Sequence, residues 1–177
     1  MKKSQSYPDN LIGDIKKRLW YQPGYEPDRM ELTADDIEPL LNMLDPTSRH
    51  VIDCRYQEKL SYDAIVKRPE VKFARSSIGA HCRRTLDKLA LFHVSTMIAK
   101  DKGQVTIATL PISTRTRCAL VRNRITTIED LKECTYSRIM GMRGVSLKGY
   151  DSLIRAMRMY NIDVSNLMPM LVGRNGA

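Results

Sequence analysis

Apolar residues recur at intervals of three and four along most of this chain, and this spacing constrains the fold more than any other feature. The stretches Thr33–Leu44 and Ser76–Phe92 both follow the pattern. Such spacing gathers apolar side chains on one face of an α-helix. Hydroxyl residues begin both stretches, and Pro46 and Pro69 interrupt the chain between them, as is typical of helix boundaries. The sequence therefore predicts an all-α fold.

Four helices are expected between Thr33 and Phe92. Their first residues are Thr33, Thr47 or Ser48, Ser61, and Ser76 or Ser77. Pro39 lies inside the first of them and either kinks this helix or delays its start. The pattern leaves open whether the fourth helix continues through residues 94–98.

The length of 177 residues leaves room for one ordinary domain or two small ones. Residues 1–31 form a polar N-terminal segment broken by prolines, with one amphipathic stretch at 11–20 that could be a short helix. Lys100–Gln104 is polar and suits a boundary. We therefore predict a first domain over residues 32–99 and a second over residues 105–171.

The formal net charge is +9, and the basic residues are unevenly distributed. Residues 71–100 hold six basic side chains and one acidic, and residues 101–177 hold twelve basic and six acidic. Residues 32–70, by contrast, are net acidic. Two basic stretches favour a polyanionic partner. The alternative is a basic, solvated surface with no specific partner.

Motifs for catalysis or metal binding are missing from the sequence. The cysteines have no Cys-x-x-Cys spacing, and His81 and His93 add no paired donors. Buried, reduced thiols are the expected state of these cysteines. We also find no glycine-rich phosphate loop and no His-Glu-x-x-His motif. We expect no metal, no cofactor and no enzymatic activity, and, because no apolar leader is present, a cytoplasmic protein.

The segment from Ser48 to Leu89 carries a more specific signal. It contains Arg55-Tyr56, then Leu60-Ser-Tyr-Asp-Ala-Ile65, and after a turn Ser76-Ser-Ile78 and Arg83-Arg-Thr-Leu-Asp-Lys-Leu89. This order resembles region four of the sigma-70 family, a helix-turn-helix domain that reads promoter DNA. The turn at 67–74 is longer than is usual in that family, so the resemblance does not imply a sigma-like promoter sequence.

The sigma resemblance implies two groups of DNA contacts in the first domain. A helix that enters the major groove presents its first residues to base edges, while flanking cations hold phosphates. The base-reading candidates are Arg75, Ser76, Ser77 and Ala80. The phosphate-binding candidates are Lys72, Arg83, Arg84 and Lys88. The alternative is a helical bundle with a solvated basic face.

Region four also binds the flap of the RNA polymerase beta subunit through apolar residues. The candidates for a shared role in this chain are Leu40, Leu41, Leu44 and Val51. A purely structural role in the core is the better interpretation for most of them.

A second module follows between Leu110 and Ile162. It begins with Leu110-x-Ile112-x-x-Arg115-x-x-x-x-Leu120 and ends with Gly141-Met-Arg-Gly-Val-Ser-Leu-Lys-Gly-Tyr150. This arrangement resembles the C-terminal domain of the bacterial RNA polymerase alpha subunit, a compact domain that contains a helix-hairpin-helix. Helix-hairpin-helix units of repair proteins, which clamp DNA nonspecifically, are a rival resemblance.

The alpha-subunit resemblance implies that Arg115 enters the minor groove of A/T-rich DNA, where the negative potential is enhanced. Cys118 replaces an asparagine of the family, and Arg117 is the candidate substitute for that contact. In the hairpin, Ser146 replaces a glycine and Gly149 a serine. The hairpin residues implied to approach phosphate are Gly141, Arg143, Gly144, Ser146 and Lys148.

Together, the two resemblances predict a transcription regulator that binds double-stranded DNA at promoters and contacts bacterial core RNA polymerase. It lacks the sigma region that melts promoter DNA, and a phage or mobile element would have use for such a combination. Two alternatives stay open. One is a DNA-binding repressor without polymerase contact, and the other is a protein that binds polymerase surfaces but not DNA.

Overall fold

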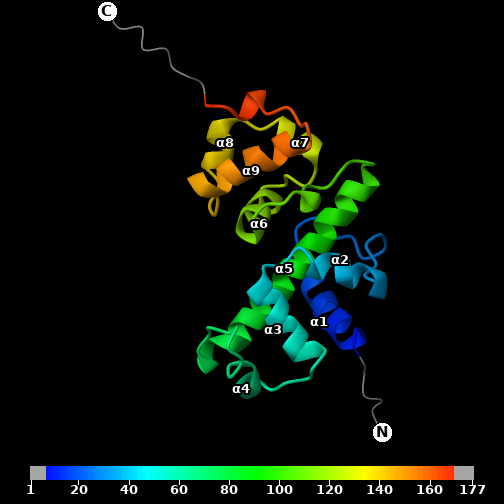
Figure 1. The fold of residues 1–177 in the computed structure, drawn as a ribbon. Helices are drawn as coiled ribbons and strands as arrows, with labels where there is room; N and C mark the ends of the chain where they lie inside the picture. The colour runs from blue at the N-terminus through cyan, green and yellow to red at the C-terminus, as the bar shows by residue number, and fades with distance from the viewer. Residues whose placement is uncertain (1–6, 170–177) are drawn as a thin grey trace, which may run out of the picture. The chain divides into compact units, whose positions relative to one another are not determined.

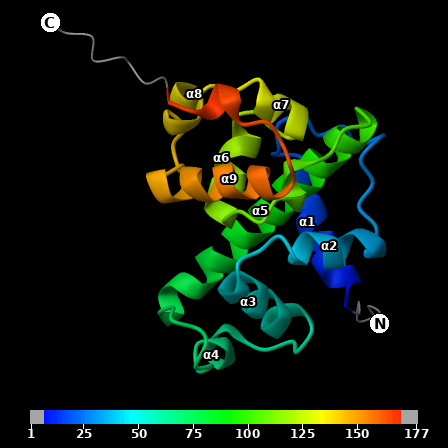
Figure 2. The same ribbon diagram turned by 45° about the horizontal axis from the view of Figure 1, so that its top comes forward.

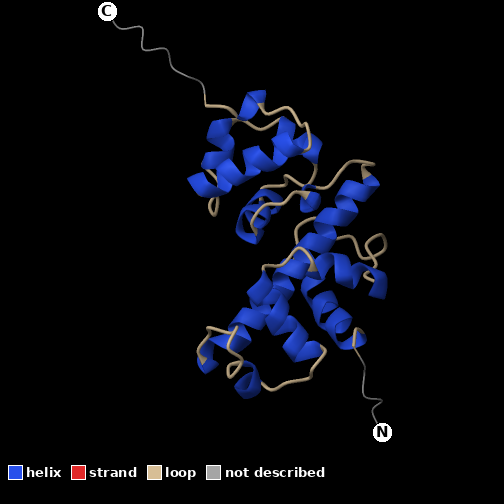
Figure 3. Cartoon of the chain, viewed as in Figure 1, coloured by secondary structure: helices blue, strands red, loops and turns tan. Residues whose placement is uncertain are grey.

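The computed structural model of the protein describes residues 7–169 (Figure 1). These residues form nine α-helices and three short 3-10 helices and contain no strand (Figure 3), which confirms the all-α prediction. The chain divides into two compact units, residues 1–98 and 99–177. Residues 1–6 and residues 170 and 171, which the predicted domains include, lie outside the described residues.

The first unit contains the N-terminal helix and the four helices expected from the sequence. α3 and α4 lie beside the N-terminal half of the long α5 in two views (Figures 1 and 2). Leu11, Ile15 and Leu19 are fully buried along one face of α1, so this helix belongs to the core of the unit. The elements are α1 (Asp9–Leu19), η1 (Ala34–Asp36), α2 (Ile37–Leu41), α3 (Pro46–Tyr56), α4 (Tyr62–Ile65) and α5 (Arg75–Asp101).

Side-chain caps set the starts of η1 and α3. The backbone N–H and the hydroxyl of Thr33 both donate to the Asp36 carboxylate, over 2.8 Å each. Pro39 follows in the first turn of α2, where a backbone N–H has no partner within the helix. Asp45 accepts from the N–H of Ser48 over 2.9 Å, so α3 begins at Pro46, slightly before the predicted start.

α5 is longer than the sequence pattern could establish. It begins at Arg75, and the Ser77 hydroxyl inside its first turn donates to the carbonyl of Ala74 over 2.9 Å. The helix continues for 27 residues and ends at Asp101, two residues before Gly103, which adopts a φ of 62°. Hydrogen bonds from the N–H groups of Gly103 and Gln104 to the carbonyls of Lys100 and Ala99 close its last turn.

A compact apolar cluster joins α3, α4 and the start of α5. Burial of these side chains fixes the short α4, because a single helical turn has little stability alone. Ser61 caps this turn as predicted, since its hydroxyl accepts from the N–H of Ala64 over 3.3 Å. The cluster consists of Val51, Cys54, Ile65, Val71, Ile78 and Cys82, with Leu60, Tyr62, Val66 and Phe73 at its edge.

The second unit consists of short helices with hydroxyl caps at most of their starts. Ser or Thr side chains accept backbone N–H bonds at the starts of η2, α6, α7, α8 and α9. An antiparallel bridge pairs Thr106 with Thr127, and the Tyr150 hydroxyl donates to the carbonyl of Leu167. The elements are η2 (Ile107–Thr109), α6 (Thr114–Arg122), α7 (Ile128–Lys132), α8 (Tyr136–Met140), α9 (Leu147–Met159) and η3 (Ser165–Leu167).

Candidate nucleic-acid interface

The first turns of α5 present a face that combines polar and cationic side chains. Ser76, Arg83 and Arg84 are exposed, and Ala80 between them is half-buried. Their spacing along the helix puts them on one side. Lys72, in the loop before the helix, is also exposed. With Arg75, which is also exposed, six of the eight predicted residues of this domain are therefore at the surface or beside it near the start of α5.

Arg75 is held at the junction between α4 and α5. Its guanidinium donates to the Asp63 carboxylate and lies over the ring of Tyr62, 5.6 Å from the ring centre. Arg55 at the end of α3 lies over the same ring at 4.9 Å. A Cβ on Gly79 would be 3.4 Å from this ring, so Tyr62 rests on the surface of α5. Arg75 therefore links α4 to α5, and its side chain remains 54% exposed.

Lys88 and Ser77 do not join the exposed face. The Lys88 ammonium lies 3.8 Å from the carboxylate of Asp45, which caps α3. The neighbouring Asp87 forms an ion pair of 3.6 Å with Arg18 of α1. Ser77 is half-buried and bonded to Ala74. Lys88 and Asp87 therefore connect α5 to the rest of the first unit, whereas the bond of Ser77 is local to the start of α5.

The pKa of His81 depends on its burial and on the cationic side chains of α5. Its ring packs on Phe73, with 4.1 Å between ring centres, and its Nε2 is 3.3 Å from the Ser48 hydroxyl. Burial lowers the pKa of His81, and the charges of Lys88 and Arg84 lower this pKa further, although Asp45 opposes them. The imidazole is therefore neutral at pH 7, and the cationic character of this face comes from lysine and arginine.

In the second unit, Arg115 lies exposed in the first turn of α6. The Ser113 hydroxyl caps the helix by accepting from the N–H of Thr116 over 3.1 Å. Arg122 is exposed seven positions later and shares this side of α6, which sequence reasoning missed. The seven-residue spacing between the two arginines was the signal that could have identified it.

The structure places Arg117 and Cys118 inside the second unit and not on a surface that DNA could contact. Arg117 is only 7% exposed, and its Nη2 donates to the carbonyls of Leu110 and Ile112 over 3.0 and 3.3 Å. Burial lowers the pKa of this guanidinium. Cys118 is 4% exposed. Arg117 thus connects the loop before α6 to the helix, and the substitute DNA contact suggested for it does not fit this position.

The turn between α8 and α9 presents the remaining predicted residues. Gly144 adopts a φ of 107°, which residues with a side chain rarely adopt. Ser146 caps α9 by accepting from the N–H of Gly149 over 3.2 Å, which explains a serine at this position. Gly141, Arg143, Ser146 and Lys148 are exposed, and Gly144 is half-buried.

Two glycines bring this turn against α6. A Cβ on Gly149 would lie 2.7 Å from the Thr116 hydroxyl, and a Cβ on Gly144 would lie 3.4 Å from the Cβ of Ala119. Because Thr116 follows Arg115 directly, the starts of α6 and α9 are neighbours. Two segments about thirty residues apart in sequence, each predicted to contact DNA, therefore lie together in the second unit.

The four apolar residues considered for polymerase contact lie in the core. Leu40, Leu41, Leu44 and Val51 are all 9% exposed or less. Their interpretation as core residues therefore agrees with the structure, and a contact with the polymerase flap through them would need the first unit to open.

Comparisons with protein-family models, curated proteins and solved structures gave no match for this chain. Among residues 7–169, no group of three or more His, Cys, Asp or Glu side chains is placed to hold a metal ion. Over the same residues, no helix combines the length and the apolar character needed to cross a membrane.

Proposed function

We propose that this protein is a transcription regulator that binds double-stranded DNA through both of its units. In the first unit, α4 and α5 act as a helix-turn-helix whose second helix enters the major groove. In the second unit, α8 and α9 act as a helix-hairpin-helix beside the minor-groove arginine Arg115. The resemblances to sigma region four and to the alpha-subunit domain support this assignment.

The observation that carries the proposal is that the α8–α9 turn packs against α6 near Arg115 in the second unit. The glycines at 144 and 149 permit the close approach of the turn to α6. An exposed arginine and an exposed lysine, Lys148, then flank the start of a 13-residue helix, where backbone N–H groups favour a phosphate. Because the exposed side chains named here are cationic, this arrangement suits a DNA backbone better than an apolar partner.

The α5 face gives independent support in the first unit. Arg83 and Arg84 are exposed near the start of the helix, with Ser76 and Ala80 nearer its N-terminus. A groove-reading helix has this distribution, with small residues toward the bases and cations toward the phosphates. We assign Ser76 and Ala80 to the bases, because a base contact by the exposed Arg75 would have to replace its ion pair with Asp63.

Titration of the whole protein against fluorescently labelled duplexes, one A/T-rich and one G/C-rich, tests DNA binding by anisotropy. We expect both duplexes to bind and the A/T-rich duplex to bind more tightly, because Arg115 reads a narrow minor groove. A folded protein that binds neither duplex would contradict the proposal and favour the protein that binds polymerase alone.

Contact with core RNA polymerase is the second part of the proposal and rests on the two resemblances. The test is retention of core polymerase by the tagged protein from nuclease-treated bacterial lysate. Retention without DNA supports remodelling of the enzyme at promoters. Loss of retention, with DNA binding intact, would leave the DNA-binding repressor as the function.

A further inference from the structure

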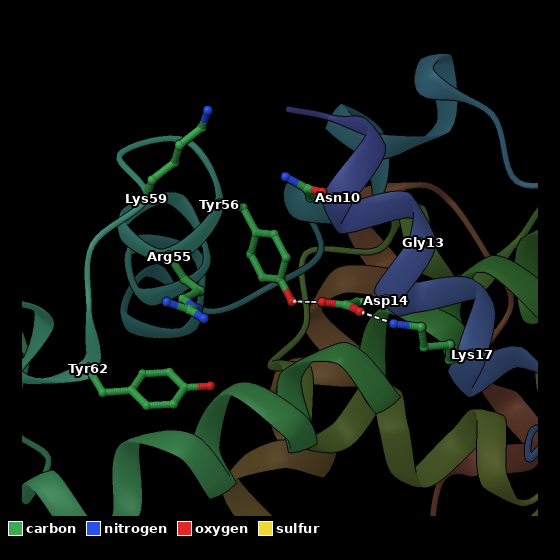
Figure 4. Close-up of a pocket in the computed structure, with 8 residues that line it drawn as sticks. All are labelled: Asn10, Gly13, Asp14, Lys17, Arg55, Tyr56, Lys59 and Tyr62. Carbon is green, nitrogen blue, oxygen red and sulfur yellow. Dashed lines mark hydrogen bonds and ion pairs between the residues drawn. The ribbon is translucent and has the colours of Figure 1, made fainter. Parts of the chain in front are cut away.

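A polar pocket of about 580 Å³ lies in the first unit between α1 and the end of α3 (Figure 4). One wall is a face of α1, and the opposite wall is formed by the last turn of α3 and the loop that follows it. Its volume is within the range of small-molecule sites. Neither the DNA-binding residues of α5 nor any residue of the second unit lines it.

The lining of this pocket is cationic. Lys17, Arg55 and Lys59 contribute three positive charges, and Asp14 contributes the one negative charge among the lining residues. Both oxygens of Asp14 are engaged, one by Lys17 over 2.7 Å and the other by the Tyr56 hydroxyl over 2.8 Å (Figure 4). Burial raises the pKa of Asp14, but these two hydrogen bonds and the charge of Lys17 outweigh burial and leave the pKa below its ordinary value. The carboxylate therefore stays ionised, and the pocket keeps an excess of two positive charges.

One backbone feature of the lining lacks an explanation in folding. Gly13 lies in the middle of α1, where glycine costs about 1 kcal/mol relative to alanine. A Cβ at this position would meet no atom within 4 Å, so packing does not require a glycine. Lys59, by contrast, adopts a φ of 56° just after α3, and this left-handed turn lets the N–H of Leu60 donate to the carbonyl of Cys54 over 2.9 Å. Both residues line the pocket, and glycine at position 13 keeps the α1 wall open to a ligand.

We infer that this pocket binds a phosphate group. An arginine fork and lysine ammoniums are the side chains that recognise phosphate, and the excess of two charges matches a doubly charged anion better than a carboxylate. The Arg55 guanidinium is oriented for this role, because one Nη donates to the carbonyl of Leu60 over 3.0 Å while the group lies over Tyr62. The phosphate belongs to a free phosphorylated small molecule or to the backbone of a nucleic acid.

The test is a titration of the isotope-labelled whole protein with inorganic phosphate, followed by NMR at constant ionic strength against sodium chloride. We expect saturable shifts of the amide signals of Gly13 and Lys59. Lys59→Asn removes one charge but suits the left-handed backbone, and it should weaken phosphate binding at least about tenfold. Gly13→Glu places a carboxylate in the pocket and should abolish binding.

Lys16→Gln is the matched control, because Lys16 is exposed on α1 outside this pocket. It should leave phosphate affinity unchanged. The inference is overturned if the shifts do not saturate, or if the Lys16 and Lys59 variants bind phosphate equally. Since Lys59→Asn does not replace a buried residue, its spectrum reports directly whether the fold is kept.

Addition of duplex DNA to the phosphate-bound protein distinguishes the two sources of the phosphate. Displacement of phosphate by duplex would identify a DNA backbone phosphate as the occupant. Persistence of the phosphate-bound signals, with duplex bound elsewhere, would identify a free phosphorylated molecule. The phosphate titration itself contains no DNA. A lack of phosphate binding in this pocket is therefore distinguished from a lack of the proposed DNA binding.

Discussion

Gly149 at the start of α9 sits so close to Thr116 of α6 that a Cβ would lie 2.7 Å from the threonine hydroxyl. This hydroxyl is itself held 2.9 Å from that of Ser113, the cap of α6. The relationship joins the two helix starts that we propose to contact DNA. It also explains why a glycine, and not the serine of the alpha-subunit pattern, occupies this position.

Gly149→Ala should therefore destabilise the second unit. Thr116 is buried and short, so it cannot move aside without breaking its bond to Ser113. We expect a loss of about 1–3 kcal/mol in the free energy of unfolding, measured with urea. Gly13→Ala in α1 is the matched control and should stabilise the protein by about 0.5–1 kcal/mol. Equal effects of the two substitutions would contradict the close approach.

Arg117→Met should cost stability and leave DNA binding unchanged. The substitution keeps an unbranched apolar stem but removes the donor to the carbonyls of Leu110 and Ile112. We expect a loss of about 1–3 kcal/mol in thermal or urea unfolding. Duplex affinity, measured below the unfolding transition, should match that of the unaltered protein. A variant of normal stability with weakened DNA binding would instead return Arg117 to the DNA interface.

Arg115→Ala should weaken binding to A/T-rich duplex more than to G/C-rich duplex. The side chain is exposed, so the fold should be unaffected, and the change removes the minor-groove cation. Fluorescence anisotropy with the two duplexes measures the difference. Lys132→Gln, at an exposed lysine of α7, is the control for loss of charge alone. The minor-groove assignment fails if Arg115→Ala and the control affect both duplexes equally.

The stability of the first unit should fall as the pH drops below neutrality, in part because of His93. This histidine is 2% exposed, and burial lowers its pKa despite the Met30 carbonyl and the charge of Asp36. Between the lowered folded pKa and the unfolded value near 6.5, the unfolded chain binds the extra proton. The stabilisation is thus complete above pH 6.5 and is lost as the pH falls through the folded pKa.

His93→Leu should flatten this pH dependence. Urea unfolding at pH 7.5 and pH 5.5 measures the change for both proteins. Burial also lowers the pKa of His81, so the stability of the variant should still depend weakly on pH. An unchanged slope in His93→Leu would show that His93 does not contribute to the pH dependence.

Local sequence signals predicted the helices of the first unit well where a cap and an apolar face coincide. Ser61 marks α4 because its hydroxyl binds the N–H three residues later, which needs no distant contact. The length of α5 was left open, although residues 94–98 contain neither proline nor glycine to end a helix. The end of the helix before Gly103 depends on the left-handed backbone of this glycine.

The residues of the candidate interface were predicted less completely, because the sequence does not show whether a basic side chain is exposed or bonded within the protein. Arg117 is buried by carbonyl groups five and seven residues earlier, a loop geometry that the pattern does not encode. Lys88 is drawn to Asp45, 43 positions away. The pocket beside Tyr56 depends on Asp14, 42 positions away. The sequence of α1 contains no pattern that predicts this contact.

The salt dependence of duplex binding tests the central claim most directly. We would measure anisotropy from low to moderate salt for the unaltered protein, for Arg83→Gln/Arg84→Gln and for the control Lys16→Gln. The logarithm of affinity should fall steeply with the logarithm of salt concentration, and the double variant should reduce the slope by about 0.9 for each phosphate that it no longer neutralises. Lys16→Gln should keep the full slope. A flat dependence in a folded protein, or equal slopes in all three, would contradict a DNA-binding function for the α5 face.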